Sequence, residues 1–165
     1  MHIELRVRPL LPAAELSPRL YDPDDDDVRS IVMDLCGALD ESADFLIAGF
    51  GQARWPVDVR TDLAVFLEQL PDAVQALRAR QAAVIDLYEQ GIERTLEFLP
   101  PGDRCAVRCI SRTDWAPDPE VEELDITALD DMLLAVRDEF LKVLAQLAPS
   151  VVGHPWIAGW RQAMD

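Results

Sequence analysis

Three strand-like stretches in the middle of the chain constrain its fold more than any other feature. They span residues 82–89, 92–99 and 104–111, with turns at Gln90-Gly91 and at Pro100-Pro101-Gly102. A parallel connection needs a crossover of about a dozen residues or more, so turns this short require antiparallel pairing. The central part of the chain is therefore predicted to form a β-meander.

Further strands are predicted before the meander. Residues 2–7 alternate apolar and polar side chains, which is the period of a half-buried strand. The apolar stretches 29–39 and 44–50 are joined by four mostly polar residues, which indicates a β-hairpin. A short helix over 29–39 is the alternative, because periodicity alone does not decide between a strand and a helix in a short apolar run.

Two helices are predicted between the hairpin and the meander. Residues 61–70 place apolar side chains on one helical face, and Thr61 or Asp58 can cap that helix. Pro71 then suits the first position of another helix running to about Arg80, because the amide hydrogen that proline lacks has no helical partner there.

A long helix and a short helix are predicted after the meander. Thr127 and Asp130 resemble a capping pair, and Pro149 marks the end of the long helix. A terminal helix over about 155–164 brings Trp156 and Trp160 onto one face, where they close the core. The long helix carries a single apolar stripe made of Leu129, Met132, Leu133, Val136, Phe140, Val143, Leu144 and Leu147.

Strands grouped apart from helices predict an α+β fold: an antiparallel sheet of about five to six strands with helices packed on one face, and a long helix near the C-terminus. The chain has 165 residues, of which 50% are hydrophobic, so we expect residues 1–165 to form a single domain. No apolar run approaches the roughly 18 residues of a membrane span, and the N-terminus does not resemble a signal peptide, which predicts a cytoplasmic protein.

The charge of the chain limits its partners. It carries 31 acidic and 15 basic residues, a formal net charge of −16. Phosphate groups would be repelled, which argues against direct binding of nucleic acid or of an anionic membrane and favours a basic protein partner. The simpler alternative is that the charge only keeps the protein in solution.

The acidity is most concentrated in the segment YDPDDDD, which contains Asp24, Asp25, Asp26 and Asp27. Calcium loops alternate their oxygen ligands and include a glycine and a terminal glutamate, so this contiguous run is not an EF-hand. We interpret it as a solvated loop that becomes a docking surface if a basic partner exists.

A second acidic surface is predicted on the sheet. Glu93, Thr95 and Glu97 alternate with apolar residues, and Asp86 and Tyr88 share a face of the neighbouring stretch. An aromatic residue among carboxylates suits protein recognition, although the aromatic residues could equally close the sheet edge. The loop after the meander adds the candidate partner-binding residues Trp115, Glu120, Glu122 and Glu123.

The sequence carries no recognisable catalytic or metal motif. Cys105 and Cys109 lie about 13 Å apart if they share a strand, too far for one zinc ion. Of the two histidines, His2 and His154, each lies near one end of the chain, and the glycines at 49 and 51 lack the third glycine of a dinucleotide-binding loop. We therefore expect no metal, no cofactor and no enzymatic activity, and we expect reduced thiols in the core.

This combination of features resembles the immunity proteins of bacterial polymorphic toxin systems. The resemblance lies in the small, acidic α+β character and in the stretches WPVDVRTDLAVFLEQLP at 55–71 and IDLYEQGIERTLEF at 85–98. It implies a protein without catalysis that binds a cognate, basic toxin domain and blocks it by contact.

Two alternatives belong to other classes of function. One is an enzymatic or small-ligand domain with a pocket near Trp55, using Arg54 and Arg112. The other is a nucleic-acid mimic that regulates a DNA-binding protein. The oligomeric state is not indicated by the sequence.

Overall fold

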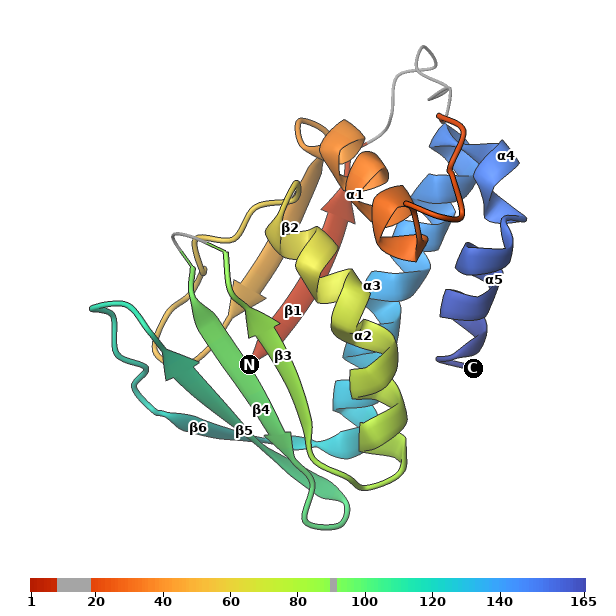
Figure 1. Cartoon of the computed structure of the whole chain (residues 1–165). Coiled ribbons are helices and arrows are strands. Elements are labelled where there is room, and N and C mark those ends of the chain that lie inside the picture. Colours follow the sequence, from red (N-terminus) through yellow and green to blue (C-terminus); the bar gives the residue numbers. More distant parts are fainter. Residues whose placement is uncertain (9–18, 90–91) are drawn as a thin grey trace.

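The structure, a computed structural model, describes residues 1–8, 19–89 and 92–165 and has the predicted α+β architecture (Figure 1). Within these residues the strands form two antiparallel sheets instead of one, with the orders β1-β2 and β3-β4-β5-β6. The elements in chain order are β1 (His2–Val7), α1 (Val28–Leu39), β2 (Ala43–Ala48), α2 (Asp62–Arg78), β3 (Ala83–Leu87), β4 (Arg94–Leu99), β5 (Arg104–Ser111), β6 (Val121–Asp125), α3 (Ile126–Leu147), α4 (Pro149–Val152) and α5 (Pro155–Gln162).

The meander predicted from the short turns is confirmed as β3, β4 and β5. Val84 pairs with Glu97, and Glu97 pairs with Arg108, so the three strands share one register. The turn residues at positions 90 and 91 lie outside the described residues. The strand predicted over residues 2–7 is also confirmed as β1, but it pairs with β2 in a separate sheet.

The hairpin predicted over 29–50 is wrong in its first half, where the helical alternative is right, whereas the strand predicted over 44–50 is confirmed as β2. Residues 28–39 form α1, whose amide at Arg29 donates to the Asp27 carboxylate, 2.8 Å away. The buried residues of α1 recur at helical spacing, so an apolar run that looked like a strand packs as one face of a helix. They are Ile31, Val32, Leu35, Cys36 and Leu39.

The two helices predicted on either side of residue 70 are one helix, α2, which contains Pro71 in its interior. A proline at this position leaves the carbonyl four residues earlier, that of Leu67, without its helical donor. The indole nitrogen of Trp160 donates to that carbonyl oxygen at 2.9 Å. A side chain from α5 therefore replaces the missing helical hydrogen bond and lets α2 continue.

The strand β6 was not predicted, and it corrects the start of the long helix. Asp125 is the last residue of β6 and caps α3, because its carboxylate accepts hydrogen bonds from the amides of Thr127 and Ala128 at 2.9 and 3.0 Å. Asp130, expected to cap with Thr127, instead forms an ion pair with Arg78 at 3.1 Å.

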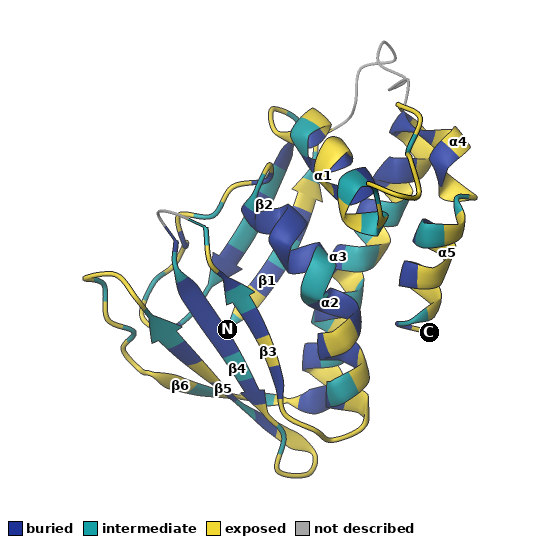
Figure 2. Cartoon of the chain, in the orientation of Figure 1, coloured by how far each residue is buried: buried dark blue, intermediate teal, exposed yellow. Residues whose placement is uncertain are grey.

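The core lies between the sheets and the helices. Figure 2 shows buried residues where strands and helices face one another, and exposed residues along loops and outer helix surfaces. Phe66 and Leu67 of α2, Phe140 of α3, and Leu96 and Phe98 of β4 are fully buried. The expected closing role of α5 holds for Trp160, which is buried against Phe140, whereas Trp156 is partly exposed.

The open edge of β3 is covered by a side chain of α2. The Gln69 amide accepts a hydrogen bond from the main-chain N–H of Asp86 at 2.8 Å and donates to the carbonyl oxygen of the same residue at 3.0 Å. This pair of bonds copies the contacts that a neighbouring strand would make.

Replacing Gln69 with leucine should lower the free energy of unfolding by about 1–2 kcal/mol, because both main-chain groups of Asp86 lose their partner. Urea denaturation measures the change. Gln81→Leu is the control at an exposed position, where the change should stay within about 0.5 kcal/mol. Equal, small losses in the two variants would show that water replaces the Gln69 amide at no cost.

Candidate protein-binding face

One face of the four-stranded sheet points away from the core. Side chains alternate along a strand, so every second residue of β3 to β6 belongs to this face. We call it the outer face. It consists of Val84, Asp86, Thr95, Glu97, Leu99, Arg104, Ala106, Arg108, Ile110, Val121, Glu123 and Asp125, and we include Tyr88 and Arg112, which directly follow β3 and β5.

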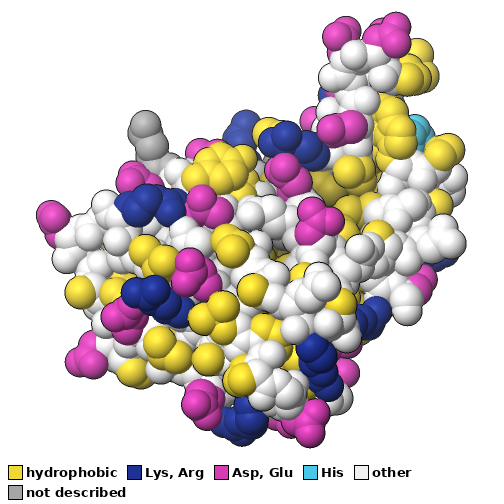
Figure 3. Space-filling model, turned by 60° about the horizontal axis from the view of Figure 1, so that its bottom comes forward, with side chains coloured by type: hydrophobic (Ala, Val, Ile, Leu, Met, Phe, Trp, Pro, Cys, Tyr) yellow, Lys and Arg dark blue, Asp and Glu magenta, His cyan; other side chains and the backbone are white. Residues whose placement is uncertain are grey.

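The outer face exposes large hydrophobic side chains. Val84, Tyr88, Leu99 and Val121 are 52%, 49%, 44% and 44% exposed, and they make up most of the exposed large hydrophobic residues that the structure describes. Figure 3 brings the lower side of Figure 1 forward and shows hydrophobic side chains lying among acidic and basic ones. Glu97 and Arg108 lie between Val84 and Val121 in the register, so the exposed hydrophobic side chains flank a charged centre.

The charges on the outer face are paired. Arg112 donates to the Asp86 carboxylate at 2.7 Å and to the Thr95 hydroxyl at 2.6 Å. Arg108 donates to Glu120 at 2.6 Å and lies 3.9 Å from Glu97. The outer face is thus not the purely acidic surface that we predicted.

The arginines of this face were not among the predicted site residues. Arg104, Arg108 and Arg112 recur every fourth residue, so in an extended strand they point to the same side as the carboxylates of β4 and β6. Glu97 stands directly opposite Arg108 in the register, and Arg104 lies 3.4 Å from Glu123. Opposite charges in facing positions stabilise a sheet, and this pairing was the available signal.

Two predicted acidic residues lie elsewhere. Glu122 alternates to the inner side of β6, where its carboxylate accepts hydrogen bonds from the Phe50 amide and the α-ammonium group of Met1. Glu93 precedes β4 with a positive φ of 44°, so it interrupts the alternation expected from 93 to 97. Its carbonyl accepts a hydrogen bond from the Arg112 amide at 3.0 Å.

The aspartate run is a structured turn before α1. Asp26 accepts two hydrogen bonds from Arg19, at 2.6 and 2.8 Å, and one from the Asp22 amide at 2.9 Å. These hydrogen bonds lower the pKa of Asp26, and the bonds from Arg19 have the largest effect. Asp27 caps α1, and Asp26 is paired with Arg19. The other two aspartates of the run, Asp24 and Asp25, are exposed and form no ion pair within the described residues.

Trp115 is part of a stack with a buried arginine. The Arg94 guanidinium carbon lies 3.5 Å from the centre of the Trp115 ring and 4.6 Å from that of Trp55. Arg94 is 3% exposed, and its Nη1 donates to the Gln52 side chain at 2.8 Å. Burial lowers the pKa of Arg94, and the faces of the two indoles attract the cation that burial destabilises. Trp115 therefore serves the fold by covering Arg94.

The loop that carries Trp115 is packed against the loop after β2. The Asp118 amide donates to the carbonyl oxygen of Phe50 at 3.0 Å. Gly51 has a φ of 82°, and a Cβ atom there would lie 2.3 Å from the carbonyl oxygen of Asp118. Glycine is thus required at position 51 by both its backbone conformation and this close approach.

The residues named for a ligand pocket near Trp55 each have a partner within the described residues. Trp55 is 1% exposed and packs against Phe50 and Trp115. Arg54 is paired with Asp44, and Arg112 is paired with Asp86.

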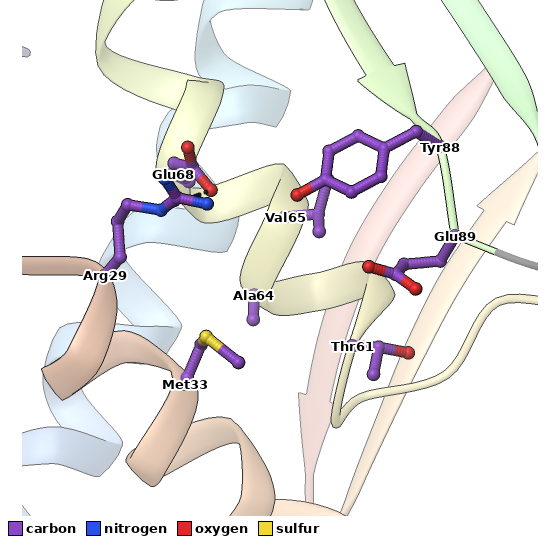
Figure 4. Close-up of a pocket in the computed structure, with 8 residues that line it drawn as sticks. All are labelled: Arg29, Met33, Thr61, Ala64, Val65, Glu68, Tyr88 and Glu89. Atoms are coloured by element: carbon purple, nitrogen blue, oxygen red, sulfur yellow. Dashed lines mark ion pairs between the residues drawn. The ribbon is translucent and has the colours of Figure 1, made fainter.

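A small hollow lies beside Tyr88. It has a volume of about 130 Å³ and lies between α1, α2 and the end of β3 (Figure 4). Figure 4 shows the Tyr88 ring reaching over Val65 while Met33, 56% exposed, lies at the opposite side. Met33 was not predicted as a surface residue of the candidate site, because residues 29–39 were interpreted as a strand. The full lining is Arg29, Met33, Thr61, Ala64, Val65, Glu68, Tyr88 and Glu89.

Two further searches of the described residues concern metals and membranes. No three histidine, cysteine, aspartate or glutamate side chains among residues 1–8, 19–89 and 92–165 are grouped to hold a metal ion. No helix in the same ranges is long and apolar enough to cross a bilayer. Comparison of the chain with protein-family models, with curated proteins and with solved structures finds no match.

Proposed function

We propose that the protein is a non-catalytic inhibitor that binds a basic toxin domain of bacterial origin through the outer face and acts in the cytoplasm. The observation that carries the proposal is the exposure of Val84, Tyr88, Leu99 and Val121 on one sheet face. Hydrophobic side chains held on a rigid sheet lose little entropy on binding, so the face is suited to contact with a second folded protein.

The electrostatics of the chain support a basic partner. The net charge of −16 creates a negative potential that accelerates association with a cationic surface. Arginine–carboxylate pairs lie between the hydrophobic residues of the outer face, with Glu97 and Arg108 separating Val84 from Val121 in the register. These charges restrict which partner fits, while the hydrophobic residues beside them supply most of the affinity.

The Tyr88 side chain is the proposed anchor. It is the one aromatic residue of the outer face as defined above, it is 49% exposed, and it borders the hollow against α2. Tyrosine combines a large apolar ring with a hydroxyl group and is enriched among the residues that dominate interface energies. A partner side chain entering the hollow beside it would be enclosed on three sides by α1, α2 and β3. Neutralisation then follows from covering the active site of the partner, without any reaction.

We expect the double variant Tyr88→Ala/Val121→Ser to bind the partner about 30-fold more weakly, the loss associated with a dominant interface residue. The partner is first isolated from a lysate of the source organism and purified. Its binding to each variant is measured by surface plasmon resonance at low and high salt, and its toxic activity is assayed with the wild-type protein present in equal amounts.

The matched control is Leu20→Ala/Val152→Ser, which removes two exposed hydrophobic side chains outside the outer face. This control should bind and neutralise as the wild type does. Equal binding by both double variants would place the interface elsewhere. A purified partner whose activity continues at full rate in the complex would refute the inhibitor function even if binding is tight.

A further inference from the structure

A groove runs along β1 on the side away from β2. It has a volume of about 740 Å³ and lies between β1, the first half of α3 and the end of β6. It shares no residue with the outer face. Its lining consists of Met1, His2, Ile3, Glu4, Leu5, Leu124, Ala128, Asp131, Met132, Ala135, Val136 and Glu139.

The groove exposes an unpaired strand edge. In an antiparallel pair, alternate residues direct their main-chain groups toward the partner and away from it. The Arg8 amide donates to the Ser42 carbonyl, which shows that the even-numbered residues of β1 direct their main-chain N–H and C=O groups toward β2. The main-chain groups of Ile3 and Leu5 therefore point away from β2, toward the groove. Among the described residues, β1 pairs with β2 alone.

One main-chain donor at this edge has a weak partner. The Ile3 amide donates to the sulfur of Met132 at 3.1 Å. A thioether is a poor acceptor compared with a carbonyl oxygen, and a methionine side chain is flexible enough to move aside. An extended peptide along β1 would offer its carbonyl to Ile3 in place of the sulfur.

The side chains of the groove indicate which peptide fits. Most of the lining is apolar, its acidic groups are the carboxylates of Glu4, Asp131 and Glu139, and no lysine or arginine lines it. Glu4 forms an ion pair with Arg6, and Glu139 forms one with Lys142. Asp131 forms no ion pair within the described residues. A second copy of this chain would bring the same carboxylates together, which disfavours self-association here.

We infer that this groove binds an extended protein segment in which apolar and basic residues alternate, added as a strand to the free edge of β1. Main-chain hydrogen bonds to Ile3 and Leu5 would supply affinity, and apolar side chains would enter the groove while basic ones contact Asp131 and Glu4. The inference does not depend on the outer face being an interface, since the two surfaces use different residues.

The test uses a fluorescein-labelled peptide of four Lys-Leu repeats and follows its fluorescence anisotropy as the full-length protein is added. Saturable binding is expected with the wild type, and at least tenfold weaker binding with Asp131→Arg. The matched control Asp72→Arg makes the same charge change at an exposed position of α2 and should weaken binding far less. A peptide of four Glu-Leu repeats should not bind.

A second variant separates shape from charge. Ala135→Trp fills the groove without changing its charge and should abolish binding, whereas Ala158→Trp at an exposed position of α5 should not. Hydrogen exchange at the Ile3 amide should slow when the peptide is bound. Absence of saturable binding to the wild type, or equal weakening by Asp131→Arg and Asp72→Arg, would overturn the inference; the latter result would show attraction by net charge alone.

Discussion

Replacing Asp62 with asparagine should stabilise the protein at pH 8 by about 3 kcal/mol and change its stability by less than about 1 kcal/mol near pH 4. Asp62 is 3% exposed, and its Oδ1 atom has no hydrogen-bond partner among the residues that the structure describes. Burial raises its pKa to about 6; the hydrogen bond from the Asp58 amide opposes this shift, and the charges of Asp58 and Glu89 add to it.

The sign of the effect follows from proton linkage. The folded protein holds the Asp62 proton more tightly than the unfolded chain, so this carboxyl favours folding below the unfolded pKa of about 4. That contribution is lost as the pH rises through 6, where the buried group must ionise. Asparagine stays neutral and keeps an acceptor oxygen for the Asp58 amide, which is 2.8 Å from Asp62 Oδ2.

The wild type and Asp62→Asn are unfolded with urea at pH 4, 6 and 8, and their unfolding free energies are subtracted at each pH. Groups that titrate equally in the two proteins do not contribute to this difference. Asp72→Asn, at an exposed position of the same helix, is the control for the loss of a carboxylate, and it should change the stability by no more than about 0.5 kcal/mol. An Asp62→Asn difference that is flat from pH 4 to 8 would mean that Asp62 ionises in the folded protein as it does in water.

Replacing Trp160 with phenylalanine should cost about 3 kcal/mol of stability, because it removes the donor to the buried Leu67 carbonyl and leaves a small cavity. The loss should be smaller by about 1–2 kcal/mol in a Pro71→Ala background. Alanine at this position supplies the helical amide that proline lacks, and this amide takes over the carbonyl oxygen once the indole is gone.

The four proteins of this double-mutant cycle are compared by thermal and urea unfolding. Trp156→Phe is the control for loss of an indole ring, because Trp156 is partly exposed on the same short helix. It should be less destabilising than Trp160→Phe and independent of residue 71. Equal losses for Trp160→Phe with and without the Pro71→Ala substitution would show that the Leu67 carbonyl contributes nothing to the role of Trp160.

Elements with a strong local pattern were predicted correctly. The strands of the meander and the long apolar stripe of α3 each depend on residues close together in the sequence. The failures involve partners that lie far apart: Pro71 stays inside α2 because of an indole 93 positions beyond Leu67. The strand β6 was missed because its acidic residues have low strand propensity, and pairing with β5 overrides that preference.

The candidate site was predictable in part for the same reason. Alternation along a strand predicts Asp86, Tyr88 and Glu97 on one face. Asp86 and Glu97 lie on the outer face, whereas Tyr88 follows the last residue of β3 and borders the hollow against α2. Alternation alone did not reveal that arginines of β5 stand opposite those carboxylates, since this depends on the register between strands. Nor did it reveal that Trp115 folds back over Arg94, a contact between a loop and the start of β4.

The amide of Gln69 also affects how the molecules associate with one another. Growth of a fibril by strand addition needs two open edges on the same sheet, so that each molecule joins one neighbour on either side. In the described chain, Gln69 occupies the middle of the β3 edge, and β6 forms the other edge of the four-stranded sheet. Pairing of four-stranded sheets edge to edge through β6 would therefore stop at two molecules, because the β3 edge of each sheet cannot accept a further strand.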